Sequence, residues 1–327
     1  MKTVTKPQDL AAAEICFGVE IETMIPVTAG ITVGAYHRGT TVTQGRDEAG
    51  LLHTAPVLAP RDRVDVGTWH ADRDGSIRCD EGYMPCEFVS PILRGEAGLE
   101  NLCAMIEFIQ RVGGKVNASC GLHITVGIKS VIGSSDTAAV KEFVRKIGHV
   151  ANQNAWAIYA QTGTGRHTNG YSASLAPECA EHLRRIACDA TPMSDLTNYA
   201  AACGRGMVNL QKAFMTDRGA IEFRAFAGTL NREKVLHHLA TVLGLVRRAA
   251  VSQVLGAFKK SSKKNRASTA PQALRRMWRI LGWCDATECQ HLALGLFGML
   301  HAEFGAYRKA ALEMAEQFEA RFPAANL

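Results

Sequence analysis

The feature that most constrains this sequence is residues 15–23, where apolar and acidic side chains alternate. Every second residue from Phe17 to Ile21 is apolar, whereas Glu20 and Glu22 fall on the opposite face of the predicted strand. A strand glutamate usually faces water, because a carboxylate is rarely buried without a partner. A sheet with several such strands therefore needs a solvated face or a group that compensates the charges.

Charged side chains recur on three further predicted strands. These side chains are Glu87 within 84–90, His123 within 121–128, and Glu222 with Arg224 within 220–228. Neighbouring carboxylates repel one another and burial raises their pKa, so they stay ionised only when a cation joins them. Clusters of oxygen ligands favour Mg²⁺ or Mn²⁺ over zinc. The pattern therefore predicts a site for a divalent cation on the sheet.

The remaining periodicities predict an α+β fold with a mostly antiparallel sheet and flanking helices. Further strands are expected at 69–77 and 207–215, the latter joined to 220–228 by a TDRG turn, and residues 24–66 are expected to form a hairpin or loop region. Helices are expected at 96–112, 136–159 and 177–189, and over most of the chain after Asn231. We therefore predict one catalytic domain over 1–327, with a sheet-based core at 14–231 and a helical C-terminal extension at 232–327.

Composition and charge exclude several classes of protein. The chain has 327 residues, of which 47% are hydrophobic and 21% charged, which is typical of a folded globular protein. Lysine and arginine number 37 against 31 acidic residues, so the net charge of +6 suits nucleotide phosphates but does not favour nucleic acid. The lysine-rich segment 259–268 is expected to be a solvated loop. No membrane span, signal peptide or CxxC pair is found, which predicts a cytoplasmic protein.

Other metal and phosphate motifs are weak. HExxH and GxxxxGK[ST] are absent, and the group Cys284, Cys289 and His291 is better explained by core packing than by zinc. The pair His70 and Asp72 could bind a metal, but a solvated strand face explains it equally well. Because no phosphate-binding loop motif is present, nucleotide phosphates would be held by metal and arginine. Arg224 and Arg205 are the candidates, because guanidinium groups match phosphate oxygens. The alternative for Arg224 is a structural salt bridge to Glu222 or Glu20.

Several of these segments occur together in a known order. The motifs are FGVEIET, DGSI, CEFVSPIL, CGLHITV, RGMVNL and AIEFRAFAGTLN, spread over residues 16–231. In this order and spacing they resemble the amidoligase family, ATP-dependent carboxylate–amine ligases that share the glutamine synthetase-like catalytic fold. The resemblance implies a curved, mostly antiparallel sheet that carries ATP and Mg²⁺, with Mn²⁺ as an alternative ion.

The resemblance also implies roles for single residues. Implied metal ligands are Glu20, Glu22, Glu87, Glu222 and His123. Implied nucleotide-binding residues are Arg224, Arg205 and Asn209, and the catalytic set is Arg224, Arg205 and His123. Asp74 and Ser76 match the DGS motif near the acceptor substrate. Many relatives read GLHxHV, whereas Thr125 stands at the second histidine here.

The implied activity is amide formation between a small-molecule or peptide carboxylate and an amine, through an acyl phosphate made from ATP. A phosphotransferase on the same fold, acting on a guanidine or a carboxylate, is the first alternative. A non-catalytic protein that binds nucleotide or metal is the second, with the helical C-terminus packed on another chain. The stripe of Leu236, Leu239, Leu243 and Val246 is more typical of core than of an interface. The sequence does not determine the oligomeric state, and a homo-oligomer is compatible with it.

Overall fold

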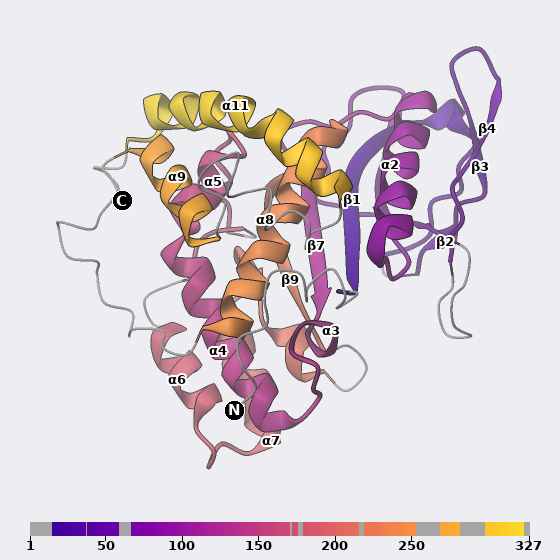
Figure 1. Cartoon of the computed structure of the whole chain (residues 1–327). Helices are drawn as coiled ribbons and strands as arrows, with labels where there is room; N and C mark the ends of the chain where they lie inside the picture. Colours follow the sequence, from indigo (N-terminus) through magenta and orange to yellow (C-terminus); the bar gives the residue numbers. More distant parts are fainter. Residues whose placement is uncertain are drawn as a thin grey trace. The chain divides into compact units, whose positions relative to one another are not determined.

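The computed structural model describes residues 15–36, 38–58, 67–170, 172–175, 179–215, 219–252, 269–281 and 298–323 (Figure 1). Two compact units are present. The sheet unit contains residues 16–124 and 227–236, and the helical unit contains the rest of the described chain. Cys284, Cys289 and His291, which were expected to pack in the core rather than to bind zinc, and the lysine-rich segment lie outside the described residues.

The sheet unit contains the strand with alternating apolar and acidic side chains that was predicted around residues 15–23. Strand β1 (Phe17–Pro26) pairs antiparallel with β6 (Tyr83–Val89), which pairs antiparallel with β5 (His70–Asp72), and β5 pairs with β2 (Thr40–Thr41). The register places Glu22 opposite Glu87 and Glu87 opposite Asp72, so three carboxylates form a row across three strands. The mostly antiparallel sheet in a mixed helix and sheet fold agrees with the prediction.

Burial of the apolar positions fixes which face of β1 carries the acids. Phe17, Val19 and Ile21 are at most 2% exposed, and each such side chain contributes roughly 1.5–3 kcal/mol. Helix α2 (Gly95–Arg111) buries a face that includes Leu99 and Ile106, close to its predicted bounds. The indole N–H of Trp69, the residue before β5, donates to Asn101 Oδ1 of α2 at 2.8 Å. This hydrogen bond connects the start of β5 to α2.

The region after β1 forms a hairpin, as predicted. Strands β3 (Gln44–Arg46) and β4 (Leu52–Thr54) make a separate two-stranded antiparallel sheet, and a 3₁₀ turn, η1 (Val27–Ala29), follows β1. The predicted strand 69–77 is shorter than expected, because only His70–Asp72 pairs with β6 before the chain turns. Asp74 begins that turn, with its Oδ1 accepting from the Ser76 backbone N–H at 2.6 Å.

Strand β7 (Gly121–Gly127) begins in the sheet unit and ends in the helical unit. In the strand order β7 lies between β1 and β9 (Ala220–Ala227), and β8 (Val208–Asn209) pairs with β9 at the end of the order. Strands β8 and β9 are antiparallel. The predicted strand 207–215 stops at Asn209, because the Asn209 Oδ1 accepts from the Gln211 backbone N–H at 3.1 Å and turns the chain into the 3₁₀ helix η3 (Gln211–Phe214). The TDRG turn lies mostly outside the described residues.

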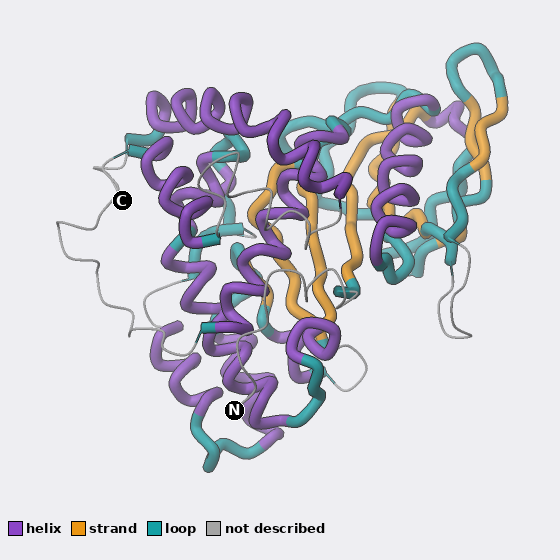
Figure 2. Tube along the Cα trace, in the orientation of Figure 1, coloured by secondary structure: helices purple, strands orange, loops and turns teal. Residues whose placement is uncertain are grey.

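Helices make up most of the helical unit (Figure 2). They are α3 (Ile128–Ile132), α4 (Thr137–Gln153), α5 (Ala155–Ala160), η2 (Arg166–Thr168), α6 (Cys179–Ala187), α7 (Met193–Ala202), α8 (Arg232–Val251), α9 (Ala270–Ile280) and α11 (Gly298–Arg321). The predicted helix 136–159 is broken at Asn154, whose side-chain amide donates to the Val150 carbonyl. The predicted helix near 177–189 corresponds to α6, whereas α7 was not predicted.

The apolar stripe of α8 is core, as predicted. Leu236, Leu239, Leu243 and Val246 are each 0% exposed. Within the described chain, no helix has both the length and the apolar character needed to cross a membrane.

Candidate functional site

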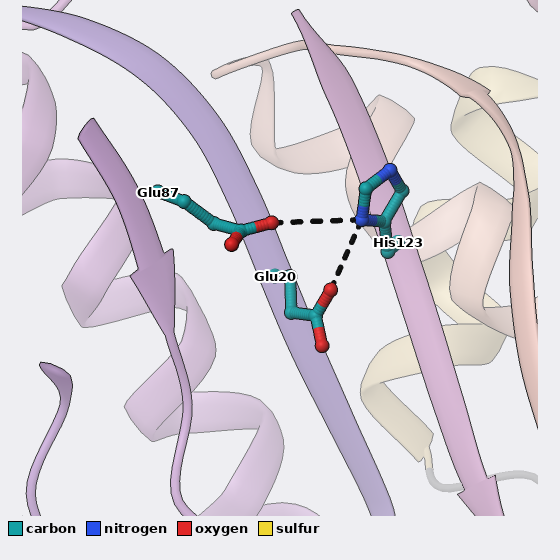
Figure 3. A group of neighbouring side chains, drawn as sticks. All are labelled: Glu20, Glu87 and His123. Carbon is teal, nitrogen blue, oxygen red and sulfur yellow. Dashed lines mark hydrogen bonds and ion pairs between the residues drawn. The ribbon is translucent and has the colours of Figure 1, made fainter. Parts of the chain in front are cut away.

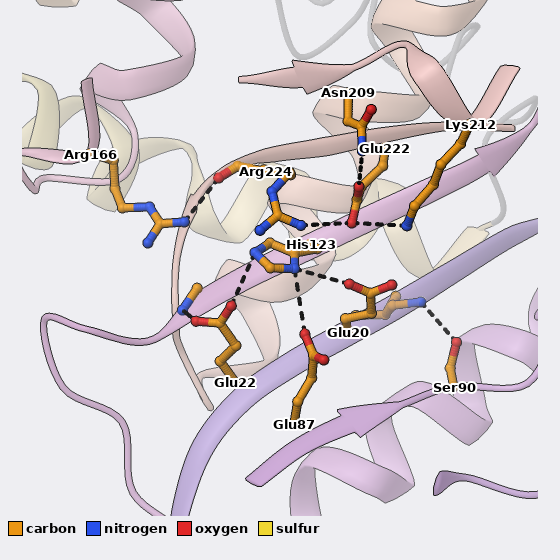
Figure 4. Close-up of polar contacts among 12 residues, drawn as sticks. Glu20, Glu22, Glu87, Ser90, His123, Arg166, Asn209, Lys212, Glu222 and Arg224 are labelled. Atoms are coloured by element: carbon orange, nitrogen blue, oxygen red, sulfur yellow. Dashed lines mark hydrogen bonds and ion pairs between the residues drawn. The ribbon is translucent and has the colours of Figure 1, made fainter. Parts of the chain in front are cut away.

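Four predicted site residues meet in the sheet unit: Glu20, Glu87 and His123 (Figure 3), and Glu22 beside them (Figure 4). The His123 Nδ1 lies 3.0 Å from Glu20 Oε2 and 3.6 Å from Glu87 Oε1, and its Nε2 lies 3.2 Å from Glu22 Oε1. The side chains of His123, Glu22 and Glu87 are 2%, 6% and 7% exposed, and that of Glu20 is 22% exposed. Three carboxylates from β1 and β6 thus surround one imidazole of β7.

Strand geometry explains this gathering. Glu20 and Glu22 stand two residues apart on β1, so their side chains leave the same face, and Glu87 faces Glu22 from β6. The second Glu22 oxygen accepts from the Gly121 backbone N–H at 2.5 Å, which fixes this carboxylate against the start of β7. Strand pairing and this hydrogen bond therefore fix the positions of Glu22 and Glu87.

The electrostatics of the cluster depend on burial. Desolvation is the main cause that raises the pKa of Glu87 from 4.5 to about 6, and the charges of Glu20 and Glu22 raise it further, whereas contact with His123 opposes the shift. The carboxylates are thus costly to keep ionised unless positive charge joins them. His123 supplies part of that charge only when its ring is protonated, since then both nitrogens donate.

The donor set fits a hard divalent cation. Two groups have ligand atoms that all lie within 4.8 Å of one another, namely Glu20, Glu87 and His123, and Glu22, Asp74 and Glu87. Carboxylate oxygens with at most one imidazole are typical of Mg²⁺ or Mn²⁺ ligands. Asp74, expected near the acceptor substrate, therefore lies beside the acidic cluster, and Ser76 next to it is exposed.

A second polar cluster lies in the helical unit (Figure 4). Glu222 of β9, whose side chain is 1% exposed, accepts at Oε1 from Arg224 Nη1 at 3.0 Å and from Lys212 Nζ at 3.1 Å. Its Oε2 accepts from Asn209 Nδ2 at 3.0 Å. The salt bridge between Arg224 and Glu222, which was the alternative to a phosphate-binding role for Arg224, is present. Glu222 belongs to neither of the potential metal-binding groups found among the described residues.

Two residues of this second cluster were not predicted as site residues. Lys212 stands three positions after Asn209, and in a continuous strand the two side chains would leave opposite faces. The turn after β8 removes that restriction and brings both to Glu222. Arg166 is 7% exposed and donates from Nη2 to the Arg224 backbone carbonyl at 3.0 Å. The predicted Arg205 is exposed and makes no hydrogen bond or ion pair with other described residues.

Comparison of the sequence with protein families finds a match over most of the chain. Residues 13–246 match the model of a family described as "Putative amidoligase enzyme". The chain belongs to this family. The family assignment made from the motifs is therefore confirmed, and the amidoligase match contains every residue of both clusters. Family membership supports an enzyme of ligase type.

Beyond the family, similarity is found among solved structures. No curated protein matches the chain. Among solved structures, the chain is similar to a bifunctional glutathione synthetase from Pasteurella multocida, with a TM-score of 0.40 and 10% identity. The similarity covers 96% of this chain and 52% of that structure, so the amidoligase chain spans about half of its length.

Proposed function

We propose that the protein is an ATP-dependent carboxylate–amine ligase with a sheet of the glutamine synthetase-like type. The observation that carries this proposal is the cluster of Glu20, Glu22 and Glu87 around His123, because it combines buried acids with the motifs of the amidoligase family. An ordinary structural sheet gains nothing from three carboxylates at one point, since each costs free energy to bury.

Glu20, Glu22, Glu87 and His123 would hold the divalent cation, with Asp74 adjacent to them. When bound, such an ion neutralises charge on the phosphate oxygens of ATP. Arg224, Asn209 and Arg205 are assigned to the nucleotide, and Asp74 and Ser76 to the acceptor side. The assignment of both clusters to one reaction rests on their common place in the amidoligase match.

The proposed reaction has two steps. In the first, an oxygen of the acceptor carboxylate attacks the γ-phosphorus of ATP, and the bond between that phosphorus and the ADP oxygen breaks. Arg224 stabilises the charge on the transferring group through its guanidinium N–H groups. In the second, a neutral amine attacks the acyl carbon and phosphate leaves, so one proton must pass from the amine to a carboxylate or to water. The products are an amide, ADP and phosphate.

The test is incubation of the protein with ATP, Mg²⁺ and a mixture of amino acids and amines, followed by mass spectrometry. We expect a product that has the combined mass of an acid and an amine less one water, formed together with ADP. A stable phosphorylated product would instead indicate a phosphotransferase, and absence of any nucleotide turnover would indicate a protein that only binds its ligands.

A matched pair of variants connects the product to the site. Glu22→Gln is expected to fold as the native protein does and to lose about 10²–10³-fold in the rate of ligation, comparable to the loss of one charge-stabilising group. Glu100→Gln changes an exposed side chain of α2 and should retain the native rate. Near-normal turnover by Glu22→Gln would refute the assignment of the site.

A further inference from the structure

Arg166 connects the loop that follows α5 to strand β9. It is 7% exposed, and its Nη2 donates to the Arg224 backbone carbonyl at 3.0 Å (Figure 4). A buried guanidinium needs acceptors, because its charge is costly to desolvate. The Arg166 carbonyl accepts from Ser172 Oγ at 2.7 Å, and the Ser172 carbonyl accepts from the Tyr159 hydroxyl of α5 at 2.6 Å. These two hydrogen bonds fix the backbone that carries the guanidinium.

The next side chain along η2, that of His167, lies among aromatic rings. The rings around it belong to Trp156 and Tyr159 of α5 and to Phe318 and Phe322 at the end of α11. Of these four, Phe322 is the nearest, with its ring centroid 4.6 Å from that of His167. The five rings form the His167 cluster. Arg166 and His167 are successive residues of η2, so this one turn contacts both β9 and α11.

Ring packing, rather than hydrogen bonding, holds the His167 cluster together. His167 Nδ1 and Trp156 Nε1 are buried and have no hydrogen-bond partner within the described chain. Burial also lowers the pKa of His167 below its usual value, which keeps the ring neutral at pH 7. The ring therefore contributes its shape to this contact, and a phenylalanine ring should serve as well.

Further contacts connect the end of α11 to the same loop. Arg321 Nη1 donates to the Gly163 carbonyl at 3.4 Å, and a Cβ added to Gly165 would lie 3.5 Å from Phe322 Cζ. Helix α11 lies after the end of the amidoligase match, whereas the loop and β9 lie within it. A helix outside the family match thus contacts the loop that supports Arg224.

We propose that α11 positions Arg224 indirectly, through the His167 cluster and Arg166. Arg166 is then a positioning residue, because it contacts the backbone of β9 at the point where the Arg224 side chain begins. The inference rests on the proposed function, in which Arg224 is assigned to the nucleotide. It gives the C-terminal helix a role in the reaction besides packing.

The first test measures the affinity for a non-hydrolysable ATP analogue with Mg²⁺ by calorimetry. Arg166→Met is expected to weaken binding about tenfold or more, because the hydrogen bond from a charged donor to the Arg224 carbonyl is lost. Arg184→Met removes an arginine from an exposed position of α6 and should leave the affinity unchanged. Native affinity in Arg166→Met, with both proteins folded by circular dichroism, overturns the inference.

The second test asks whether ring packing at α11 controls the same affinity. His167→Ala should weaken binding about fivefold, whereas His167→Phe should stay within about twofold of the native protein, because the ring contacts remain. Phe322 is partly exposed, so Phe322→Ala leaves the buried core in place and should also cost about fivefold. Equal losses of affinity in His167→Phe and His167→Ala would refute the role of ring packing.

A double variant tests whether α11 acts through Arg166. In the Arg166→Met background, Phe322→Ala should weaken binding by less than about twofold further, because the contact through which it acts is already lost. An undiminished effect of Phe322→Ala in this background overturns the assignment of Arg166 as the connection.

The outcomes separate this inference from the ligase proposal. If the native protein joins an acid to an amine while Arg166→Met and Phe322→Ala bind the analogue normally, only the inference fails. If those variants lose affinity while the native protein forms no amide, the positioning role stands and the ligase proposal fails. Absence of analogue binding by the native protein refutes both.

Discussion

Replacement of Glu87 by glutamine should make the metal-free protein more stable at neutral pH, although it removes a proposed metal ligand. Glu87 lies within the buried carboxylate cluster, and burial raises its pKa to about 6. Glutamine has nearly the same shape but carries no charge to desolvate. His123 keeps its two closer contacts, to Glu20 at 3.0 Å and to Glu22 at 3.2 Å, so the imidazole stays paired.

The magnitude follows from the shift in pKa. A difference of one pKa unit corresponds to about 1.36 kcal/mol, and the folded-state pKa of Glu87 rises from 4.5 to about 6, so ionised Glu87 lowers the free energy of unfolding by about 2 kcal/mol. Because this pKa is raised, the contribution of Glu87 to stability is fully present below pH 4.5 and is lost as the pH rises through 6. The gain of Glu87→Gln should therefore grow across this range and level off above it.

Urea denaturation of both proteins, with a chelator present, measures this difference at several pH values. We expect Glu87→Gln to be more stable by about 1–2 kcal/mol at pH 8 and about as stable as the native protein near pH 4.5. Added Mn²⁺ should reverse the order, because only the native cluster binds the ion well. A variant that is less stable than the native protein at pH 8 without metal would refute the claim that the cluster is electrostatically costly.

Three further substitutions test the contacts that stabilise the fold around the site. Asp136 is the N-cap of α4, and its side chain accepts from the Ala138 and Ala139 N–H groups at 3.1 Å each. Asp136→Ala should lower the free energy of unfolding by about 1 kcal/mol, whereas Asp136→Asn should retain most of the native stability. Equal stability of the native protein and both variants in urea would contradict this. Gly228→Ala would place a Cβ 2.5 Å from the Cys120 Cβ and should cost about 1–3 kcal/mol, while Gly75→Ala, which meets nothing within 4 Å, serves as the control in the same denaturation assay. Trp69→Phe leaves the buried Asn101 without its 2.8 Å donor and should lower the melting temperature by several degrees; an unchanged melting curve would show that this bond adds nothing.

Much of the acidic cluster could be predicted because strand periodicity is local. The alternation around Glu20 and Glu22 specifies a shared face whatever the strand pairs with, and the same argument applies to His123 on β7. Helix α2 was predicted to within two residues because its apolar spacing and its burial agree. The break at Asn154 and the short β8 were missed, because single asparagine side chains decide them by bonding to nearby backbone.

The sequence by itself determined which side chains share a strand face, which helices have an apolar side, and which family the chain belongs to, since these depend on spacing along the chain. Only the tertiary structure decided that Glu87 faces Glu22, that His123 stands between carboxylates from two strands, and that Lys212 reaches Glu222. The physical reason is that register and turn geometry join residues far apart in sequence. A pairing shifted by one residue would send every side chain of a strand to its other face.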